Sequence, residues 1–307
     1  MTYTPPPADA IAQAQNDDVN LRLLLVQRRL YSRAKVWSGA RGLGVGLVAI
    51  GAPIATALSS DVAVAAATTA AVWFTLNRLV FGPIEARSAA LGATAQEQFD
   101  TAIFGMPRIA VRTPGLIPEE VRRLTGGKIG RKKAYSNESL RNWYPIQVDV
   151  DGAVAIAISQ RANLAYSQTL LARNAAFWLA LLVTWAATAV GIGIASDFDV
   201  LTFLLVIVLP ILPPLLDAVD EALRVRSAGR ERRALADVIQ ASVDAHAEIP
   251  IEPDQLLAWQ SQLFALRRDS PLVPDWLYWL LRPRTEDEMN DAASTIAADL
   301  NRKKDGK

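Results

Sequence analysis

The sequence has no cysteine and a single histidine, His246, among its 307 residues. These absences exclude disulfides, thiolate chemistry and a structural zinc site built from one chain. The first residues are polar and rich in proline, and the first apolar run begins only after Arg41, so we expect no signal peptide there. Basic and acidic residues are nearly balanced, 32 against 31, so the net charge gives no reason to expect binding to DNA or RNA.

Apolar residues make up 51% of the chain and are bunched into a few blocks, as in membrane proteins. Four blocks reach or approach the length of about 20 residues that a transmembrane helix requires. They are Gly42 to Ser60, Val62 to Asn77 (extendable past Arg78 to Phe81), Asn174 to Ser196, and Val200 to Leu216. Buried helices of a soluble protein are the alternative. No charge lies in the middle of a block, which argues against the relay of a pump or coupled transporter.

The four blocks predict two hairpins, because only Asp61 separates the first pair and only Asp197 to Asp199 separates the second. Neither turn carries a basic residue. Arginine and lysine gather at the opposite ends of the blocks: Arg22, Arg28, Arg29, Arg33, Lys35, Arg41, Arg78, Arg87, Arg161, Arg173, Arg224, Arg226, Arg230, Arg232 and Arg233. By the positive-inside rule, both termini and the central segment are cytoplasmic. Trp37, Trp73 and Trp178 lie towards that side, as an aromatic belt would.

We therefore expect a mainly α-helical integral membrane protein with four transmembrane helices in two hairpins and helical cytosolic stalks and domains. The chain begins with a cytosolic N-terminal helix (1–41) and transmembrane hairpin 1 (42–81). A cytosolic central region (82–173), transmembrane hairpin 2 (174–216) and a cytosolic C-terminal helical region (217–307) follow.

Within the central region, a stalk from Pro83 to about Phe104 is expected to continue the second span. A short helix starts at Pro118, and the stretch GGKIGRKK is read as a basic loop. Ala153 to Ser159 alternates like a strand, but its alanines and the breaker-free run into the third span favour a helix.

After the fourth span, one charged helix is expected from Asp217 to about Ala247 and another helix from Pro253 to about Arg268. An acidic helix starts at Thr285. The segment from Trp276 to Leu281 is apolar on all sides, which is typical of a helix that is buried between elements or docked at the membrane interface.

Small residues recur at helical spacing along the spans, for example Gly42 and Gly46 in the first block and Ala187, Gly191 and Ala195 in the third. Such rows allow helices to approach closely in lipid, either within one chain or between copies. A pore needs association between copies, since four helices pack around side chains and leave no lumen. Prolines near the end of the fourth span predict a kink or break, whose freed carbonyls line a conduit or are repaired by neighbours. The pore or kink candidates are Thr75, Asn77, Arg78, Pro210, Pro213 and Pro214.

Sequence motifs give no support to an enzyme. The stretch GLGVGLVA contains a pattern like that of dinucleotide sites, but it lies inside a span and no strand precedes it. There is no P-loop, no G-x-S-x-G and no H-E-x-x-H. We therefore expect a protein without catalytic activity, cofactor or metal.

The central region combines basic and aromatic residues: Lys128, Arg131, Lys132, Lys133, Arg141, Trp143, Tyr144 and Arg161. Arginine and lysine beside flat rings suit a ligand that carries phosphates and stacks its bases. A solvated loop that touches anionic lipid heads explains Lys128 to Lys133 equally well.

The stretch ISQRANLAYS places Gln160, Arg161 and Asn163 just before the third span. If this stretch is helical, Gln160 and Asn163 share a face, and Arg161 points beside it. The three residues form either a polar clamp onto the neighbouring stalk or a coupling site. In the second case Arg161 connects a bound phosphate, or the NWYP segment, to movement of the span.

Several stretches, in order along nearly the whole chain, resemble the SMODS-associated four-transmembrane effectors. They are NLRLLLVQRRLYSRAK, AQEQFDTAIFGMP, LRNWYP, SQRANLAYSQTLLAR and RRDSPLVPDWLYWLLRPRTEDEMNDAA. The chain departs from the family pattern at Arg108, Ser159, Ser167 and Gln168. Members of this family are described as pore-forming proteins of bacterial anti-phage systems that signal through cyclic oligonucleotides.

The resemblance implies an effector that permeabilises the bacterial inner membrane as a homo-oligomer during abortive infection. Its trigger would be a cyclic oligonucleotide second messenger, made by a functionally linked nucleotidyltransferase and sensed in the cytosolic region. The expected partners are thus the lipid bilayer, other copies of the chain and the messenger. The alternative is a non-conducting membrane scaffold or receptor that binds a cytosolic partner through its stalks and C-terminal helices.

Overall fold

The computed structural model describes residues 3–58, 60–107, 116–195, 197, 199–204 and 208–305, and all regular structure in these ranges is helical. The elements are α1 (Ala8–Ala14), α2 (Asp18–Leu58), α3 (Ser60–Leu76), η1 (Asn77–Phe81), α4 (Gly82–Ile103), α5 (Pro118–Thr125), α6 (Lys128–Asn137), α7 (Gly152–Ala195), α8 (Val200–Phe203), α9 (Leu209–Asp244), α10 (Pro253–Arg268) and α11 (Asp275–Asp305). The prediction of a mainly α-helical protein is confirmed.

The helix α10 begins and ends where the sequence predicts. Pro253 occupies its first turn, where a missing N–H breaks no helical hydrogen bond. The Gln255 side chain reaches back and accepts the Glu252 backbone N–H at 2.9 Å, so one donor at the helix start is satisfied. Arg267 and Arg268 lie in the last turn, where positive charge is favoured by the helix dipole.

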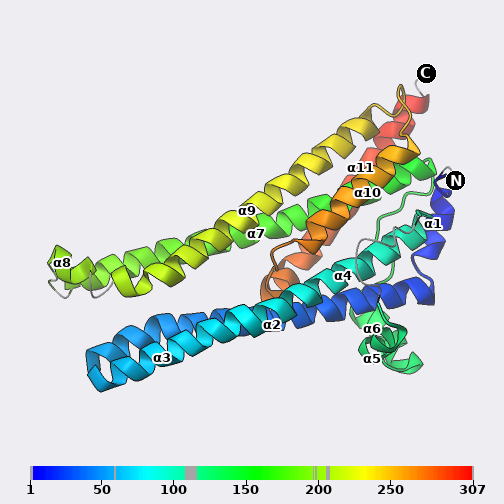
Figure 1. Ribbon diagram of the computed structural model, residues 1–307. Helices are drawn as coiled ribbons and strands as arrows, with labels where there is room; N and C mark the ends of the chain where they lie inside the picture. Colours follow the sequence, from blue (N-terminus) through cyan, green and yellow to red (C-terminus); the bar gives the residue numbers. More distant parts are fainter. Residues whose placement is uncertain are drawn as a thin grey trace.

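Two long helical hairpins form the frame of the molecule (Figure 1). In the first hairpin α2 packs against α3 and α4, and in the second α7 packs against α9. Single helices run from the predicted cytosolic regions into the predicted spans, so α2 has 41 residues and α7 has 44. At 1.5 Å per residue, α7 is about 66 Å long. Both hairpins extend in the same direction from the end of the molecule that holds the termini (Figure 1).

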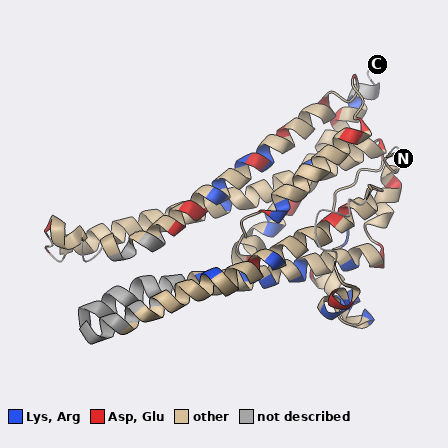
Figure 2. Cartoon of the chain, in the orientation of Figure 1, with Lys and Arg blue, Asp and Glu red and all other residues tan. Residues whose placement is uncertain are grey.

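Within the part of the chain that the structure describes, charged residues gather in the half of the molecule that holds the termini (Figure 2). Among the described residues, α7 is the helix that is long and apolar enough to cross a membrane. Its most apolar 18-residue window has a mean hydropathy of 1.9, and only 6% of that window is buried within the protein. A core helix of a soluble protein would be mostly buried. The exposed apolar surface of α7 therefore indicates an apolar environment outside the chain. The other three predicted spans lie in α2, in α3 with η1, and in α8 with the start of α9, and as membrane spans they stay predictions.

The main hydrophobic core lies where the two hairpins meet near the termini. Side chains from five helices are completely shielded from solvent there, including Ile11, Leu24, Phe99, Ile156 and Ile239. Because these residues come from α1, α2, α4, α7 and α9, the core joins the two hairpins in one body. The short helices α5 and α6 project from the side of that body (Figure 1).

A π-helical turn, η1, joins α3 to α4 at the base of the first hairpin. Arg41 of α2 donates from Nε to the Asn77 side-chain oxygen at 2.6 Å and pairs through Nη1 with Glu85 at 2.6 Å. Phe81 stacks on Trp37 at 5.5 Å between ring centroids and lies 5.4 Å from Trp73. These contacts fix an irregular helical turn, of the kind often found at functional sites, where the second predicted span ends.

The predicted kink candidates divide between η1 and α9. Asn77 and Arg78 lie in η1, and Thr75 lies just before it with its hydroxyl bonded to the Ala71 carbonyl at 2.8 Å. In contrast, α9 is helical throughout, from Leu209 past all three prolines. The stretch 209–216 is therefore helical without a break, and a kink there stays a prediction. Pro210 sits in the first turn, where no intrahelical donor is needed. Residues 205–207, directly before it, lie outside the described residues.

Within each hairpin, a glycine lets an aromatic ring of the neighbouring helix pack closely against the backbone. A Cβ atom at Gly44 would overlap the Trp73 ring, and one at Gly193 would approach the Phe203 ring to 2.7 Å. Gly42 and Gly191, which belong to the predicted small-residue rows, have no described atom within 4 Å of such a Cβ. These two glycines face outwards, so they do not pack the hairpins of one chain.

Three expectations for the segments outside the predicted spans are wrong. The predicted basic loop GGKIGRKK is mostly helix, because its last six residues begin α6. The predicted acidic helix from Thr285 is the continuation of α11, which starts at Asp275 and includes Pro283. The expectation that the whole apolar segment from Trp276 to Leu281 is buried is also wrong. Leu277 is 6% exposed, but Trp276 and Leu280 on the other face are 54% and 70% exposed.

We predict opposite effects for one added methyl group at two glycines of α2. Gly42→Ala should raise the free energy of unfolding by up to about 1 kcal/mol, since alanine favours helix and meets no neighbour. Gly44→Ala should lower it by about 1–3 kcal/mol, since Trp73 has to move. Equilibrium unfolding in mixed micelles, followed by tryptophan fluorescence, measures both. Equal effects of the two substitutions would contradict the close packing of the Trp73 ring against Gly44.

Candidate functional site

A buried ion pair lies between the two hairpins. Asp100 of α4 pairs with Arg267 of α10 at 2.5 Å, and their side chains are 0% and 8% exposed. The Tyr144 hydroxyl donates to Asp100 Oδ1 at 2.8 Å, and the Gln260 amide donates to Asp100 Oδ2 at 3.1 Å. The carboxylate thus accepts hydrogen bonds from three side chains, as a buried charge requires. We call this network, completed below by Gln160 and Asn163, the polar junction.

Burial and neighbouring charges set the protonation of Tyr144 and Arg267 in the polar junction. Burial raises the pKa of Tyr144 well above the usual range, and the Asp100 charge adds to this, so Tyr144 stays a hydrogen-bond donor. Burial alone would lower the pKa of Arg267, but the Asp100 carboxylate raises it above the ordinary value of a free arginine. Arg267 is therefore always charged, and its neutralisation depends on Asp100.

Gln160 and Asn163 of α7 complete the polar junction from the second hairpin. The Gln160 amide donates to Gln260 Oε1 at 3.0 Å and to the Leu256 carbonyl at 3.1 Å. Arg267 Nε donates to the Asn163 side-chain oxygen at 3.3 Å. Both residues thus have the geometry of a polar clamp onto a neighbouring helix. A role of either in sensing a ligand stays a prediction.

Tyr144 connects the polar junction to the N-terminal helix. Its ring packs 6.2 Å from Phe99 and 5.6 Å from Phe104, measured between centroids. Its backbone N–H donates to Gln15 Oε1 at 2.9 Å, and the Gln15 amide donates back to its carbonyl at 3.3 Å. A ring held on both sides in this way offers no free face for a base to stack on, so Tyr144 is a core residue.

Arg161 points away from the polar junction towards α9. It is half-buried, and burial lowers its pKa, whereas the carboxylates of Asp244 and Asp237 act to raise it. These two acidic residues lie on α9, so Arg161 faces the partner helix of its own hairpin. This agrees with the predicted direction of the side chain. The coupling role predicted for Arg161 is not tested by this geometry.

The basic residues of the central region do not form one site with Tyr144. Lys132 and Lys133 are exposed on α6, and Arg141 is exposed in the following segment. Arg131 pairs with Asp18 at 3.6 Å across to the start of α2. These side chains remain available to an anionic surface, but none of them is placed against the junction.

Trp143, the other aromatic candidate, belongs to a second group of residues around Arg28. The Arg28 guanidinium lies 5.9 Å from the ring centroid of Trp143, 5.3 Å from that of Tyr278 and 5.5 Å from that of Trp279. Two more cations approach these rings, since Lys35 is 4.8 Å from Tyr278 and Arg282 is 5.2 Å from Trp279. We call this group the Arg28 cluster: Arg28, Lys35, Trp143, Tyr278, Trp279 and Arg282.

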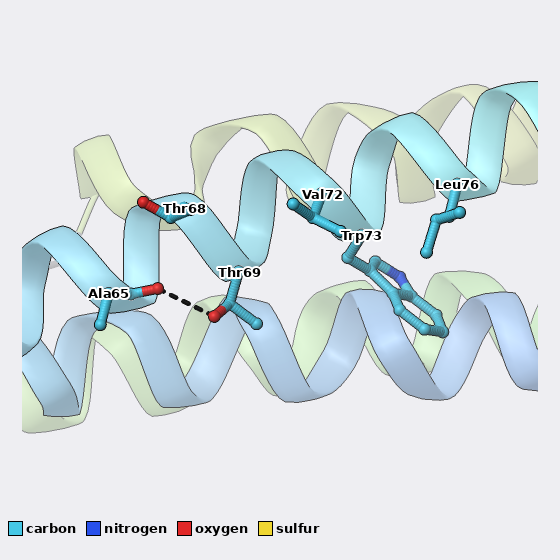
Figure 3. A pocket seen from close by; sticks show the side chains of 6 residues that line it. All are labelled: Ala65, Thr68, Thr69, Val72, Trp73 and Leu76. Carbon is cyan, nitrogen blue, oxygen red and sulfur yellow. Dashed lines mark hydrogen bonds between the residues drawn. The ribbon is translucent and has the colours of Figure 1, made fainter.

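A shallow hollow of about 480 Å³ lies on α3, in the second predicted span (Figure 3). Its lining is Ala65, Thr68, Thr69, Val72, Trp73 and Leu76. The Thr69 hydroxyl donates to the Ala65 carbonyl of its own helix at 2.8 Å (Figure 3). The hollow has no charged side chain, so it suits an acyl chain or an apolar helix better than a nucleotide.

Comparison with known proteins agrees with this architecture. A family model described as the SMODS-associating 4TM effector domain matches residues 9–296. The chain belongs to this family. It is also 23% identical over 291 residues to a protein of Bacillus cereus (strain VD146) named "Probable CBASS effector molecule", with 90% of this chain and 95% of that protein covered. No solved structure matches the chain.

Sequence reasoning missed Asp100, Gln260 and Arg267, although it found three of their neighbours. A signal for Asp100 exists in the sequence. It continues a helix face formed by Ala89, Ala93 and Gln96, which are small or uncharged, and a charge on such a face indicates a buried partner. That partner could not be read from the sequence, because Arg267 lies 167 residues away.

We predict that the buried pair is coupled in stability. Asp100→Leu or Arg267→Met alone should lower the free energy of unfolding by about 3–5 kcal/mol, since each leaves an unpaired buried charge. The double variant should lose much less than the sum of the two, since it leaves no charge unpaired. Arg284→Ala removes one partner of an exposed pair with Glu288 and serves as the control with little expected effect. Additive losses in chemical unfolding would contradict the coupling.

Proposed function

We propose that this protein is a membrane effector that permeabilises the bacterial inner membrane on a cyclic-oligonucleotide signal in anti-phage defence. Its family and its likeness to a protein named as a probable CBASS effector support the effector role. The main support for a location in the membrane is the exposed apolar stretch of α7. This helix leaves the packed cytosolic core and continues as an apolar stretch of which only 6% is buried.

In the proposed topology, both hairpins cross the bilayer and both termini lie in the cytoplasm. The distribution of charge supports it, because the charged side chains gather towards the termini (Figure 2). The ion pair of Arg41 with Glu85 and the rings of Trp37 and Phe81 would then lie near the cytoplasmic surface. Charged groups and aromatic rings are stable at that depth.

The conducting state is proposed to be a homo-oligomer. The two hairpins of one chain are separate helix pairs (Figure 1), and even four packed helices leave no lumen, so a water-filled path needs more than one copy. Exposed small residues such as Gly42 and Gly191 leave room for helices of other copies to approach. Copies that assemble through these faces could surround a water-filled path.

A cyclic oligonucleotide from a functionally linked nucleotidyltransferase is the proposed trigger. A ligand shifts a conformational equilibrium only if it binds one state more tightly than the other. The polar junction supports such a response, because it ties the stalks of both hairpins to α10. A change in the packing around α10 would therefore reach both hairpins.

Membrane integrity in cells tests this function. We expect entry of an impermeant dye and loss of membrane potential when the protein is expressed with its cognate nucleotidyltransferase, and not when either is expressed alone. A catalytically dead nucleotidyltransferase is the control. If the membrane stays intact under all conditions while the protein is present in the membrane fraction, permeabilisation is wrong and the non-conducting receptor is favoured.

Arg161 should modulate the response if α7 and α9 move relative to each other. Its guanidinium faces two carboxylates of α9, so Arg161→Ala should change the amount of cyclase-dependent dye entry severalfold while the protein still inserts. Ser167→Ala, on the same helix, is a matched control, since its hydroxyl bonds only the Asn163 and Leu164 carbonyls of its own helix. Dye entry equal to that of the parent would remove Arg161 from the mechanism.

A further inference from the structure

The Arg28 guanidinium is a cation without an acidic partner. Its terminal nitrogens, Nη1 and Nη2, are shielded from solvent and have no hydrogen-bond partner among the described residues. Lys35 and Arg282, in the same cluster, pair with Asp275 at 2.7 Å and Glu286 at 2.6 Å. The faces of aromatic rings attract a cation but offer no oxygen to its N–H groups. An acceptor from outside the chain would satisfy these donors.

Three positive charges surround a single ring in the Arg28 cluster. The charged groups of Arg28, Lys35 and Arg282 lie 5.3, 4.8 and 5.9 Å from the Tyr278 centroid. Burial lowers the pKa of Lys35, and the neighbouring charge of Arg28 acts in the same direction. Two acidic side chains therefore face three cations, and the cluster keeps one positive charge in excess. Such an excess, partly removed from water, is costly unless an anion neutralises it.

We propose that the Arg28 cluster binds a phosphodiester group, with Arg28 and Lys35 as the anion-binding side chains. A guanidinium donates two parallel N–H bonds to phosphate oxygens, and lysine supplies a point charge. Trp279 is 49% exposed, so a ligand reaches its ring first and can stack a flat group on it. Cyclic oligonucleotides and lipid headgroups both carry phosphodiesters. The choice of a nucleotide rests on the function proposed above, and the stacking ring favours it.

The position of the cluster connects a bound phosphodiester to both hairpins. Asp275, the first residue of α11, pairs with Lys35 of the first hairpin. Trp276, the next residue, lies 5.2 Å from the Phe177 ring of the second hairpin, measured between centroids. A phosphodiester that binds Lys35 competes with Asp275 for the same ammonium group. Binding would therefore weaken a contact that holds α11 against the first hairpin, just before the predicted spans.

The test compares two sources of phosphodiester on the full chain in nanodiscs. In the first arm, discs of phosphatidylcholine are titrated with fluorescent cyclic dinucleotides and trinucleotides. In the second arm, discs with added phosphatidylglycerol are used, and the lipids that remain bound are counted by native mass spectrometry. The variants are Arg28→Met, Arg28→Lys and, as a matched control, Arg33→Ala, which removes an exposed cation from the same helix.

We expect Arg28→Met to weaken binding roughly tenfold or more in one arm, since a charged bidentate contact is lost. Arg28→Lys keeps the charge but not the bidentate geometry, so its binding should be intermediate, and Arg33→Ala should bind like the parent. The arm that shows this order identifies the source as nucleotide or lipid. Without ligand, the unfolding midpoint of Arg28→Met should stay equal or rise, because an unpaired charge is removed.

The proposal is overturned if neither probe binds the parent, or if Arg28→Met binds both probes as the parent does. A lowered unfolding midpoint with unchanged binding would assign Arg28 a purely structural cation–π role. Leakage from vesicles, measured on the same proteins, separates this result from the proposed function. If binding depends on Arg28 but the vesicles do not leak, the binding site is supported and permeabilisation is rejected. If leakage is the same in the parent and in Arg28→Met, only the binding site is rejected.

Discussion

The ion pair between Asp100 and Arg267 is the contact on which the arrangement of the two hairpins depends. Removing both charges from water is expensive, so the pair is stable only while every surrounding hydrogen bond is kept. Those bonds come from α4 of the first hairpin, from α7 of the second, from α10 and from Tyr144. The pair therefore lies in the same body as the hydrophobic core that joins the two hairpins, at the end of the molecule that holds the termini (Figure 1).

Much of the fold could be predicted because its determinants are local. Pro253 and the capping residues set the start of α10, and the unbroken run from Gly152 sets the length of α7. The errors have local causes as well. Gly127 was read as part of a loop, but it serves as the N-cap of α6. The acidic helix was predicted to start only at Thr285, but α11 runs from Asp275 through Pro283, and it packs along α7. Tertiary contacts of this kind are invisible to a local reading.

The candidate site could be predicted only in part, because its members are distant in sequence. Gln160 and Asn163 were predicted from their spacing on one helix face, and their side-chain hydrogen bonds go to α10 rather than to a stalk helix, so the choice between clamp and coupling site stays a prediction. Asp100 and Arg267 were missed, because each lies among ordinary helix residues and only the fold brings them together. The Arg28 cluster has the same origin, since α2, α11 and the segment of Trp143 meet only in three dimensions. Trp143 was predicted as a candidate for ligand sensing, whereas Arg28 was predicted only as one of the basic residues that flank the spans.

The central claim is that the buried pair sets the distance between the two hairpins. Because the chain has no cysteine, spin labels can be attached at Thr69→Cys in α3 and Val190→Cys in α7 without further substitution. Pulsed electron paramagnetic resonance in nanodiscs then gives the distance distribution between the hairpins, with and without Asp100→Asn, which removes the charge but keeps the shape. The account predicts one narrow distribution for the parent and a shifted or broadened one for Asp100→Asn. Distributions that superimpose would contradict it.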